Sequence, residues 1–245
     1  MTISVQSLGR DFSGVAALDD ISFEAKPGSI TAVIGPNGAG KTTLINLMSG
    51  HLTPTRGDVL VNGRPVTGLS AHGHARLGIA RTFQRSRVFS DMTVMENMIL
   101  GQYSTDSIRP RRRRNRQQSR AEALAVLQKF GLEDKQSRIA ENLSHGDQRR
   151  VEIARALVSK PSVLLLDEPA AGMSGDDRNE LKRDLAELVN QGLTILLVEH
   201  DLELVMSLAD HVVVFDFGTI IAQGRPDVVT SNPEVQRAYM GNTHD

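Results

Sequence analysis

A glycine-rich segment between an apolar stretch and a helical pattern constrains the fold of this chain more than any other feature. Residues 35–42 fit the pattern G-x-x-x-x-G-K-[ST] at every fixed position. The apolar stretch Ile30–Ile34 predicts a buried strand, and residues 42–49 predict a helix that ends at Gly50. A strand, a glycine turn and a helix N-terminus together form a cradle in which backbone N–H groups and the helix dipole face an anion. We therefore expect a phosphate-binding loop, in which Lys41 reaches the β- and γ-phosphates and Thr42 ligates Mg²⁺.

Composition limits the remaining classes of protein. The chain has 245 residues, of which 40% are hydrophobic, enough for one large domain or two small ones. The net charge of −1 gives no indication of nucleic-acid binding, and the absence of cysteine excludes disulfides and thiolate metal sites. The N-terminus lacks the pattern of a signal peptide, and the longest apolar runs fall far short of the about 20 residues that span a membrane. Any role at a membrane is expected to come through partners.

Short alternating segments at the N-terminus predict an antiparallel sheet. Residues 3–8 and 17–23 are expected strands. Residues 59–61 and 64–66 flank the dipeptide Asn62-Gly63, which predicts a hairpin with a type I′ turn.

The pattern becomes helical from about residue 92 to residue 159. Thr93 and Glu96 form a capping-box signature, and Gly101 is expected to stop the helix that they begin. A later helical face ends at Gly131, and it is formed by Leu124, Leu127 and Phe130.

Strands return after this helical region. The stretches 163–166 and 193–198 are apolar, and between them lies a helical stripe that ends at Gly192 and is formed by Leu181, Leu185, Leu188 and Val189. This strand–helix–strand unit predicts parallel pairing of the two strands.

Two segments resemble functional motifs but have a plainer interpretation. The arginine run at residues 109–116 is expected to be a solvated, flexible stretch, with contact to anionic lipid headgroups as the alternative. Nucleic acid is the weaker interpretation, because no aromatic platform accompanies the arginines. Asp216-Phe217-Gly218 matches a kinase metal motif, but it lies between two apolar strands, and we expect a turn there.

Two acidic residues follow the apolar stretch 163–166. Asp167 can hold Mg²⁺ through its water shell, and Glu168 can polarise an attacking water. This pair alone is weak evidence, but the phosphate loop strengthens it. Two further motifs complete the set, because residues 143–148 open a helix and residues 198–201 follow a strand.

The order and spacing of these motifs resemble the nucleotide-binding subunit of an ATP-binding cassette (ABC) transporter, over nearly the whole chain. The resemblance implies an α/β fold: a phosphate-loop NTPase core of mixed sheet with helices, an N-terminal antiparallel β subdomain and an inserted helical subdomain. We expect one nucleotide-binding domain over residues 1–245, with the ATP-binding core at 1–87 and 160–245 and the helical subdomain at 88–159.

The resemblance also implies a role for each motif. Phe12 matches the aromatic residue that stacks on adenine, and Gln84 matches the glutamine that touches Mg²⁺ and senses the membrane subunit. Asp167 and Glu168 match the magnesium aspartate and the catalytic glutamate, and His200 matches the switch histidine. ATP and Mg²⁺ are therefore the expected cofactors.

The expected site is larger than these five residues. Its nucleotide contacts are Phe12, Gly35, Pro36, Asn37, Gly38, Ala39, Gly40, Lys41, Thr42, Thr43, Ser144, His145, Gly146 and Asp147. Its catalytic residues are Lys41, Glu168 and His200, and its Mg²⁺ ligands are Thr42, Gln84 and Asp167.

Several of these residues have a plainer interpretation when taken alone. Phe12 is then a core aromatic, Gln84 a solvated loop amide and His200 a structural histidine at a strand end. Ser144 with Asp147 is by itself a well-capped helix start, of the S-x-x-D kind. That interpretation is compatible with a helix N-terminus that faces the γ-phosphate of an ATP bound to a second copy.

Three departures from the commonest family pattern stand out. His145 and Asp147 replace the usual Gly and Gln of the family signature, and Ser174 stands where many members carry Asp. The last leaves open how two active sites communicate across a dimer. Residues 85–89 are expected near the groove that receives a permease helix. Met92, Met95 and Met98 either extend that contact or pack inside the helical insert.

Four stretches narrow the resemblance to the ATP-binding protein of bacterial branched-chain amino-acid uptake systems, namely residues 80–84, 148–155, 168–172 and 233–241. The lipopolysaccharide-export ATPase is similar at several of them. We expect no extra regulatory domain after Tyr239.

This resemblance implies a peripheral protein at the cytoplasmic face of the bacterial inner membrane. Its expected partners are a second ABC ATPase, identical or not, integral-membrane permease subunits and, indirectly, a periplasmic solute-binding protein, but no nucleic acid. A lipid or lipopolysaccharide exporter, a urea or amide importer and a soluble, non-transport ABC ATPase are the alternatives.

Overall fold

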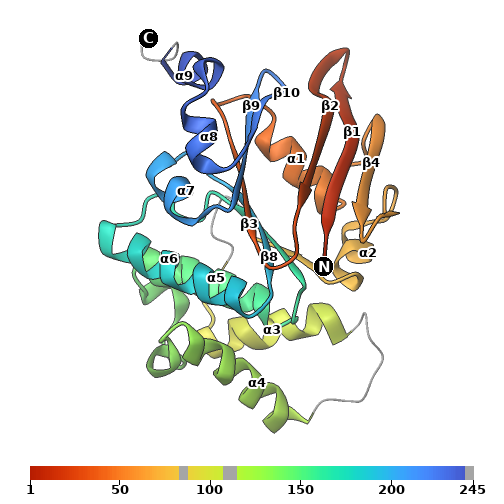
Figure 1. Ribbon diagram of the computed structural model, residues 1–245. Helices are drawn as coiled ribbons and strands as arrows, with labels where there is room; N and C mark the ends of the chain where they lie inside the picture. Colours follow the sequence, from red (N-terminus) through yellow and green to blue (C-terminus); the bar gives the residue numbers. More distant parts are fainter. Residues whose placement is uncertain (83–87, 107–114, 241–245) are drawn as a thin grey trace.

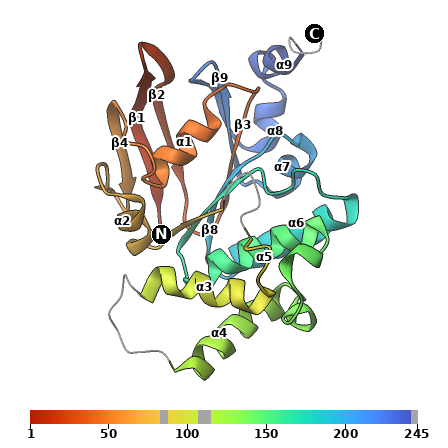
Figure 2. The same cartoon turned by 180° about the vertical axis from the view of Figure 1, so that it is seen from behind.

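The computed structural model describes residues 1–82, 88–106 and 115–240. In this part of the chain, two sheets lie on either side of helix α1, and further helices cover the second sheet (Figures 1 and 2). The expectations for Gln84, for residues 85–87 of the expected permease contact and for residues 109–114 concern residues outside the described ranges. The α/β fold expected from the sequence, a mixed sheet with helices and an antiparallel sheet, is confirmed.

The antiparallel sheet is built from the N-terminal segments. Its strand order is β2-β1-β4-β5, and its strands are β1 (Ile3–Phe12), β2 (Val15–Ala25), β4 (Arg56–Val61) and β5 (Arg64–Pro65). Asn62 and Gly63 join β4 to β5 with φ of 49° and 73°. Positive φ at both central residues defines the type I′ turn that the sequence predicts.

The second sheet is mostly parallel. Its order is β10-β9-β3-β8-β7-β6, and its strands are β3 (Ile30–Ile34), β6 (Ile79–Arg81), β7 (Val163–Asp167), β8 (Thr194–Val198), β9 (His211–Asp216) and β10 (Thr219–Gly224). The parallel pairing of β7 with β8 is confirmed. Phe217 and Gly218 form the expected turn between β9 and the antiparallel β10.

The central strands are buried on both faces, which explains their continuous apolar sequences. Alternate residues contribute to different cores. In β7, Val163 and Leu165 pack with α1 and the antiparallel sheet, whereas Leu164 and Leu166 pack with the helices on the opposite face. The second sheet therefore lies between two cores, one shared with α1 and the antiparallel sheet and one shared with the helices on the opposite face.

The helices are α1 (Lys41–Met48), α2 (Ala71–Arg76), α3 (Val94–Asp106), α4 (Arg116–Lys129), α5 (His145–Leu157), α6 (Gly175–Asn190), α7 (Leu202–Leu208), α8 (Pro226–Thr230) and α9 (Pro233–Met240). The predicted stripe of α6 is confirmed, because Leu181, Leu185 and Leu188 are buried. Within the described residues, no helix is both long and apolar enough to span a membrane.

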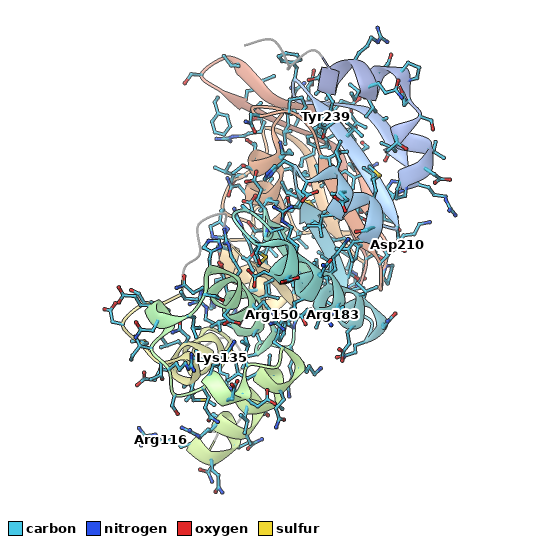
Figure 3. All side chains as sticks on the ribbon, turned by 90° about the vertical axis from the view of Figure 1, so that its left-hand side faces the viewer. Arg116, Lys135, Arg150, Arg183, Asp210 and Tyr239 are labelled. Carbon is cyan, nitrogen blue, oxygen red and sulfur yellow. The ribbon has the colours of Figure 1, made fainter. Side chains whose placement is uncertain are left out.

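A buried arginine links the helical region to α6. The Arg150 guanidinium of α5 contacts the carboxylates of Glu180 and Asp184 on α6 and the backbone carbonyl of Phe130. Figure 3 labels Arg150 near the middle of the molecule, between the helices below it and the sheets above it. This network joins α5 to α6 and to Phe130, the residue that follows α4.

The prediction that Gly101 stops a helix is wrong. The Thr93 capping box forms as expected, but α3 continues through Gly101 to Asp106. A Cβ added at Gly101 would lie 2.5 Å from the Arg155 carbonyl oxygen on α5. The glycine therefore allows two helices to approach closely, instead of ending one of them.

Candidate functional site

The phosphate loop connects β3 to α1 at the carboxyl edge of the parallel strands. Its glycines Gly35, Gly38 and Gly40 have φ of 150°, 81° and 100°. A Cβ at Gly40 would lie 2.6 Å from the Ala17 carbonyl oxygen, so this position has neither the conformation nor the space for another residue. Asn37, Gly38 and Thr42 are exposed, which leaves this side of the loop accessible to a ligand.

Lys41 is the first residue of α1, and its side chain folds back under the loop. It is only 6% exposed, and its Nζ donates to the carbonyl oxygens of Gly35 at 2.6 Å and Pro36 at 2.9 Å. Burial lowers the pKa of Lys41, while the nearby Glu168 and Asp167 carboxylates raise it. The ammonium group is thus held at the loop, close to both acidic residues.

Asp167 ends β7 and is 1% exposed. Its Oδ2 lies 3.3 Å from an Arg81 guanidinium nitrogen, whereas its buried Oδ1 has no hydrogen-bond partner among the described residues. Burial raises the pKa of this carboxyl, and Arg81 lowers it. A buried carboxylate oxygen without a protein partner is able to serve as a ligand of a cation.

Glu168 follows directly in a strained conformation. Its φ of 48° is unusual for a residue with a long side chain, and its backbone N–H donates to the Val198 carbonyl oxygen at 2.9 Å. Parallel pairing of β7 with β8 brings the strand ends together. The His200 Nδ1 consequently lies 4.0 Å from the Glu168 Oε2, and the histidine side chain is 60% exposed.

The Ser144–Asp147 segment forms the N-terminus of α5, a helix that packs on other elements than α1 does. The Ser144 Oγ accepts from the Asp147 backbone N–H at 3.1 Å, as expected for an N-cap. The expected S-x-x-D box is not completed, since the Asp147 carboxylate binds Lys135 Nζ at 2.7 Å instead. The helix α5 packs mainly on α3, α4, α6 and β6, whereas α1 packs on β2 and β7.

The loop between β7 and α6 lies beside this segment. A Cβ at Gly172 would lie 3.4 Å from the His145 ring. Ser174 then caps α6 in a full capping box with Asp177. Serine at this departure from the family pattern therefore has a local structural role.

Phe12 lies at the edge of the site. It is 41% exposed, so it is not the core aromatic of the plainer interpretation, and the Arg10 guanidinium carbon lies 4.7 Å from its ring centroid. Phe12 pairs with Val15 across the β1–β2 turn, and Ala17 of the same strand lies against Gly40. The ring is therefore carried by the strands that flank the phosphate loop.

A groove of about 520 Å³ opens on the other side of Arg81. Phe89, Gly101 and Arg155 line it, and the Arg155 guanidinium carbon lies 5.3 Å from the centroid of the half-exposed Phe89 ring. Met95 and Met98 are buried in the helical core, as the plainer interpretation of these methionines expects, while Met92 is 38% exposed.

The sequence assigned no role to two residues that the structure places in the site. Arg81 ends β6 and binds Asn46 of α1, Ser49 directly after that helix, and Asp167. Glu199 follows β8 and is fully buried. Both are charged residues beside apolar strands, and this pattern could have pointed to them.

Together, the mixed sheet, the phosphate loop at its carboxyl edge and the acidic pair on a neighbouring strand define a nucleoside-triphosphatase of the phosphate-loop class. The family model described as ABC transporter matches residues 18–171, more than half of the chain. A second model, described as branched-chain amino acid ATP-binding cassette transporter, matches residues 219–245. The chain therefore belongs to the ATP-binding subunits of ABC transporters and is an ATPase.

Full-length relatives support this assignment. The high-affinity branched-chain amino acid transport ATP-binding protein LivG of Escherichia coli (strain K12) is 41% identical, with 98% of this chain and 97% of the relative covered. The corresponding BraF of Pseudomonas aeruginosa is 38% identical with the same coverage. The solved ADP conformation of MJ1267, an ATP-binding cassette of an ABC transporter, is 31% identical, with a TM-score of 0.89 over 99% of this chain and 100% of that one.

Proposed function

We propose that this ATPase powers the uptake of branched-chain or other small amino acids through partner permeases. The similarity to LivG and BraF over nearly their whole length carries this proposal. The match of residues 219–245 to a branched-chain amino acid cassette model adds support from a part of the chain outside the common ATPase motifs.

The proposed ATP site is assembled from the phosphate loop outward. The backbone N–H groups of residues 35–43, except Pro36, which has none, bind the phosphates at the start of α1. The Lys41 ammonium moves from the loop carbonyls toward the β- and γ-phosphates. Phe12 stacks on the adenine. The burial of Lys41 strengthens its attraction to phosphate, because few waters compete for the charge.

The residues also fit Mg²⁺. Within the described ranges, no group of three or more His, Cys, Asp or Glu side chains could hold a metal by itself. Mg²⁺ in ATPases is instead held by one or two protein oxygens together with substrate phosphates. The unpaired Asp167 Oδ1 and the exposed Thr42 hydroxyl are such oxygens, and Gln84 is proposed as a third ligand. When bound, the ion neutralises charge that develops on the phosphates.

Hydrolysis is assigned to the two residues at the ends of β7 and β8. The Glu168 carboxylate polarises the attacking water, and its strained backbone holds it at the strand end. The exposed His200 ring lies 4.0 Å from this carboxylate, and it is the proposed contact with the γ-phosphate. Lys41 stabilises the negative charge that builds up during the transfer.

A second ATPase copy completes the site in this proposal. The α5 N-terminus, with Ser144, His145, Gly146 and Asp147, closes on the γ-phosphate bound by the partner copy. We propose that residues 1–245 form one nucleotide-binding domain and that residues 88–159 are its helical subdomain. The partner copy is either identical or a second ABC ATPase.

The groove beside Arg81 is the proposed contact with the permease. Phe89 and Arg155 offer an aromatic ring and a guanidinium, both of which are common at the centres of protein interfaces. A permease that docks here holds the protein at the cytoplasmic face of the bacterial inner membrane. A periplasmic solute-binding protein then reaches the ATPase only through the permease.

Reconstitution of the ATPase with its permease and its solute-binding protein tests this proposal. The binding protein loaded with leucine, isoleucine or valine should raise the ATPase rate above that of the unloaded complex, because a ligand shifts the closure of the dimer only by binding the closed assembly more tightly. Stimulation by urea alone assigns the protein to amide uptake. Dependence on lipopolysaccharide without a response to any amino acid overturns the uptake proposal.

A further inference from the structure

The Glu199 carboxylate joins the two loops that carry the proposed catalytic residues. Its Oε1 accepts from the Ala170 backbone N–H at 2.9 Å, in the loop that follows Glu168. Its Oε2 accepts from the His200 backbone N–H at 3.0 Å and lies 3.5 Å from the Asp201 backbone nitrogen. One side chain thus bridges the loop after β7 and the loop after β8.

The position of this carboxylate is costly for a residue with only a packing role. Glu199 is 0% exposed, and a buried ionised carboxylate is destabilising unless it is well hydrogen-bonded. An apolar side chain of similar volume often stabilises a fold at least as well as a buried charge. Burial also raises the pKa of Glu199, while its backbone hydrogen bonds lower it.

The bridge acts on atoms that matter for hydrolysis. The Glu168 backbone is held on one side by Val198, and the Glu199 bond to Ala170 holds the chain two residues further on. Such double support is needed where a residue with a long side chain has a φ of 48°. On the other loop, the His200 Nδ1 lies 3.6 Å from the Glu199 Oε2 and 4.0 Å from the Glu168 Oε2.

We propose that Glu199 is a positioning residue for ATP hydrolysis, which sets the distance between Glu168 and His200 by binding both of their loops through backbone N–H groups. The proposal rests on the roles assigned to Glu168 and His200 in the proposed function. The Glu199 side chain also connects His200 to the loop after β7, which continues to Gly172 beside the His145 ring. A movement of that loop would therefore reach His200 through the Glu199 side chain alone.

Two variants separate the bridge from its charge. Glu199→Gln keeps the shape of the side chain. Its NH₂ group, however, faces a backbone N–H of one of the two loops, and because both groups are donors, that hydrogen bond is lost. Glu199→Asp keeps the charge but is one methylene too short to reach both loops. Each variant of the full chain should lose about tenfold in kcat, with the Kd for ATP within twofold of wild type.

Asp210→Asn is the matched control. The Asp210 Oδ2 also accepts a backbone N–H, that of Ile30 at 2.9 Å, but it does so at the start of β3, at the opposite edge of the sheet (Figure 3 labels Asp210). This variant should keep the wild-type kcat. A loss equal to that of the Glu199 variants would show that changing any backbone-bound carboxylate at a strand end to an amide has the same effect, and would overturn the proposal.

A double-mutant cycle with His200→Ala provides the decisive readout. Because Glu199 is proposed to act through His200 and Glu168, adding Glu199→Gln to His200→Ala should change kcat less than threefold. The proposal is overturned if Glu199→Gln causes a further tenfold loss in the His200→Ala background, or if both Glu199 variants keep the wild-type kcat. It is also overturned if the Glu199 variants bind ATP more weakly and melt at a lower temperature in parallel with the loss of kcat. Failure of the proposed function is distinguishable, because the wild-type chain would then not hydrolyse ATP, or Glu168→Gln would hydrolyse it normally.

Discussion

Substitution of Gly101 by alanine reverses the usual effect of this change in a helix. Glycine inside a helix is normally about 1 kcal/mol less favourable than alanine, so propensity alone predicts stabilisation. Here, however, the new Cβ would lie 2.5 Å from the Arg155 carbonyl oxygen and 2.8 Å from the Arg155 Cγ. The carbonyl belongs to helix α5 and cannot move alone, and overpacking of this kind costs about 2–3 kcal/mol. Gly101→Ala should therefore destabilise the protein by about 1–2 kcal/mol.

Thermal unfolding of the full chain measures this difference. In a protein of this size, 1 kcal/mol shifts the melting temperature by roughly 2–4 °C, so Gly101→Ala should lower it by roughly 2–8 °C. Gly175→Ala is the control, because Gly175 begins helix α6 and no atom lies within 4 Å of its added Cβ. The control should leave the melting temperature unchanged or slightly raised. A Gly101→Ala protein that melts at or above the wild-type temperature would refute the close approach of α3 and α5.

Three further predictions concern charge. Lys41→Ala should weaken ATP binding at least about tenfold, because it removes the ammonium group beside the loop, and an unchanged affinity in a nucleotide titration would count against the whole site. Burial lowers the pKa of His74, so the unfolded chain, whose imidazole titrates near about pH 6.5, binds a proton more readily than the folded protein does. Stability should consequently fall as the pH drops below 6.5, and His74→Gln should show a smaller fall in urea unfolding, whereas equal slopes would contradict this assignment. Replacement of residues 111–114 by serine should leave the ATPase rate unchanged, and reduced binding to anionic vesicles at low salt would support lipid contact over the solvated run.

Much of the fold could be predicted because local patterns and long-range packing agree in this chain. The phosphate loop, the Asn62-Gly63 turn and the α6 stripe each carry a short-range signal that their surroundings do not oppose. Gly101 shows where this approach fails. A glycine in a helical pattern has one meaning if the chain must turn and another if a second helix lies against it, and only the position of Arg155 distinguishes the two.

The part of the candidate site that could be predicted from the sequence consists of residues that lie at the ends of strands. Asp167, Glu168 and His200 meet because β7 and β8 are parallel neighbours, which the strand–helix–strand pattern already implied. The contacts of Arg81 and Glu199 were not predictable in this way. Their partners are separated by long stretches of sequence or are backbone N–H groups, and neither kind of contact leaves a pattern in the sequence. The same holds for Asp147, whose carboxylate binds Lys135 in place of its own helix cap.

The most direct test of this account is the Glu168→Gln variant, because the central claim is that Glu168 polarises water at a phosphate cradle formed independently of it. ATP affinity should stay within about threefold of wild type, since Lys41 and the loop backbone are unchanged. The hydrolysis rate should fall at least about hundredfold, and the variant should accumulate as an ATP-bound dimer. ATP hydrolysis by Glu168→Gln at a rate near that of the wild type would contradict the account.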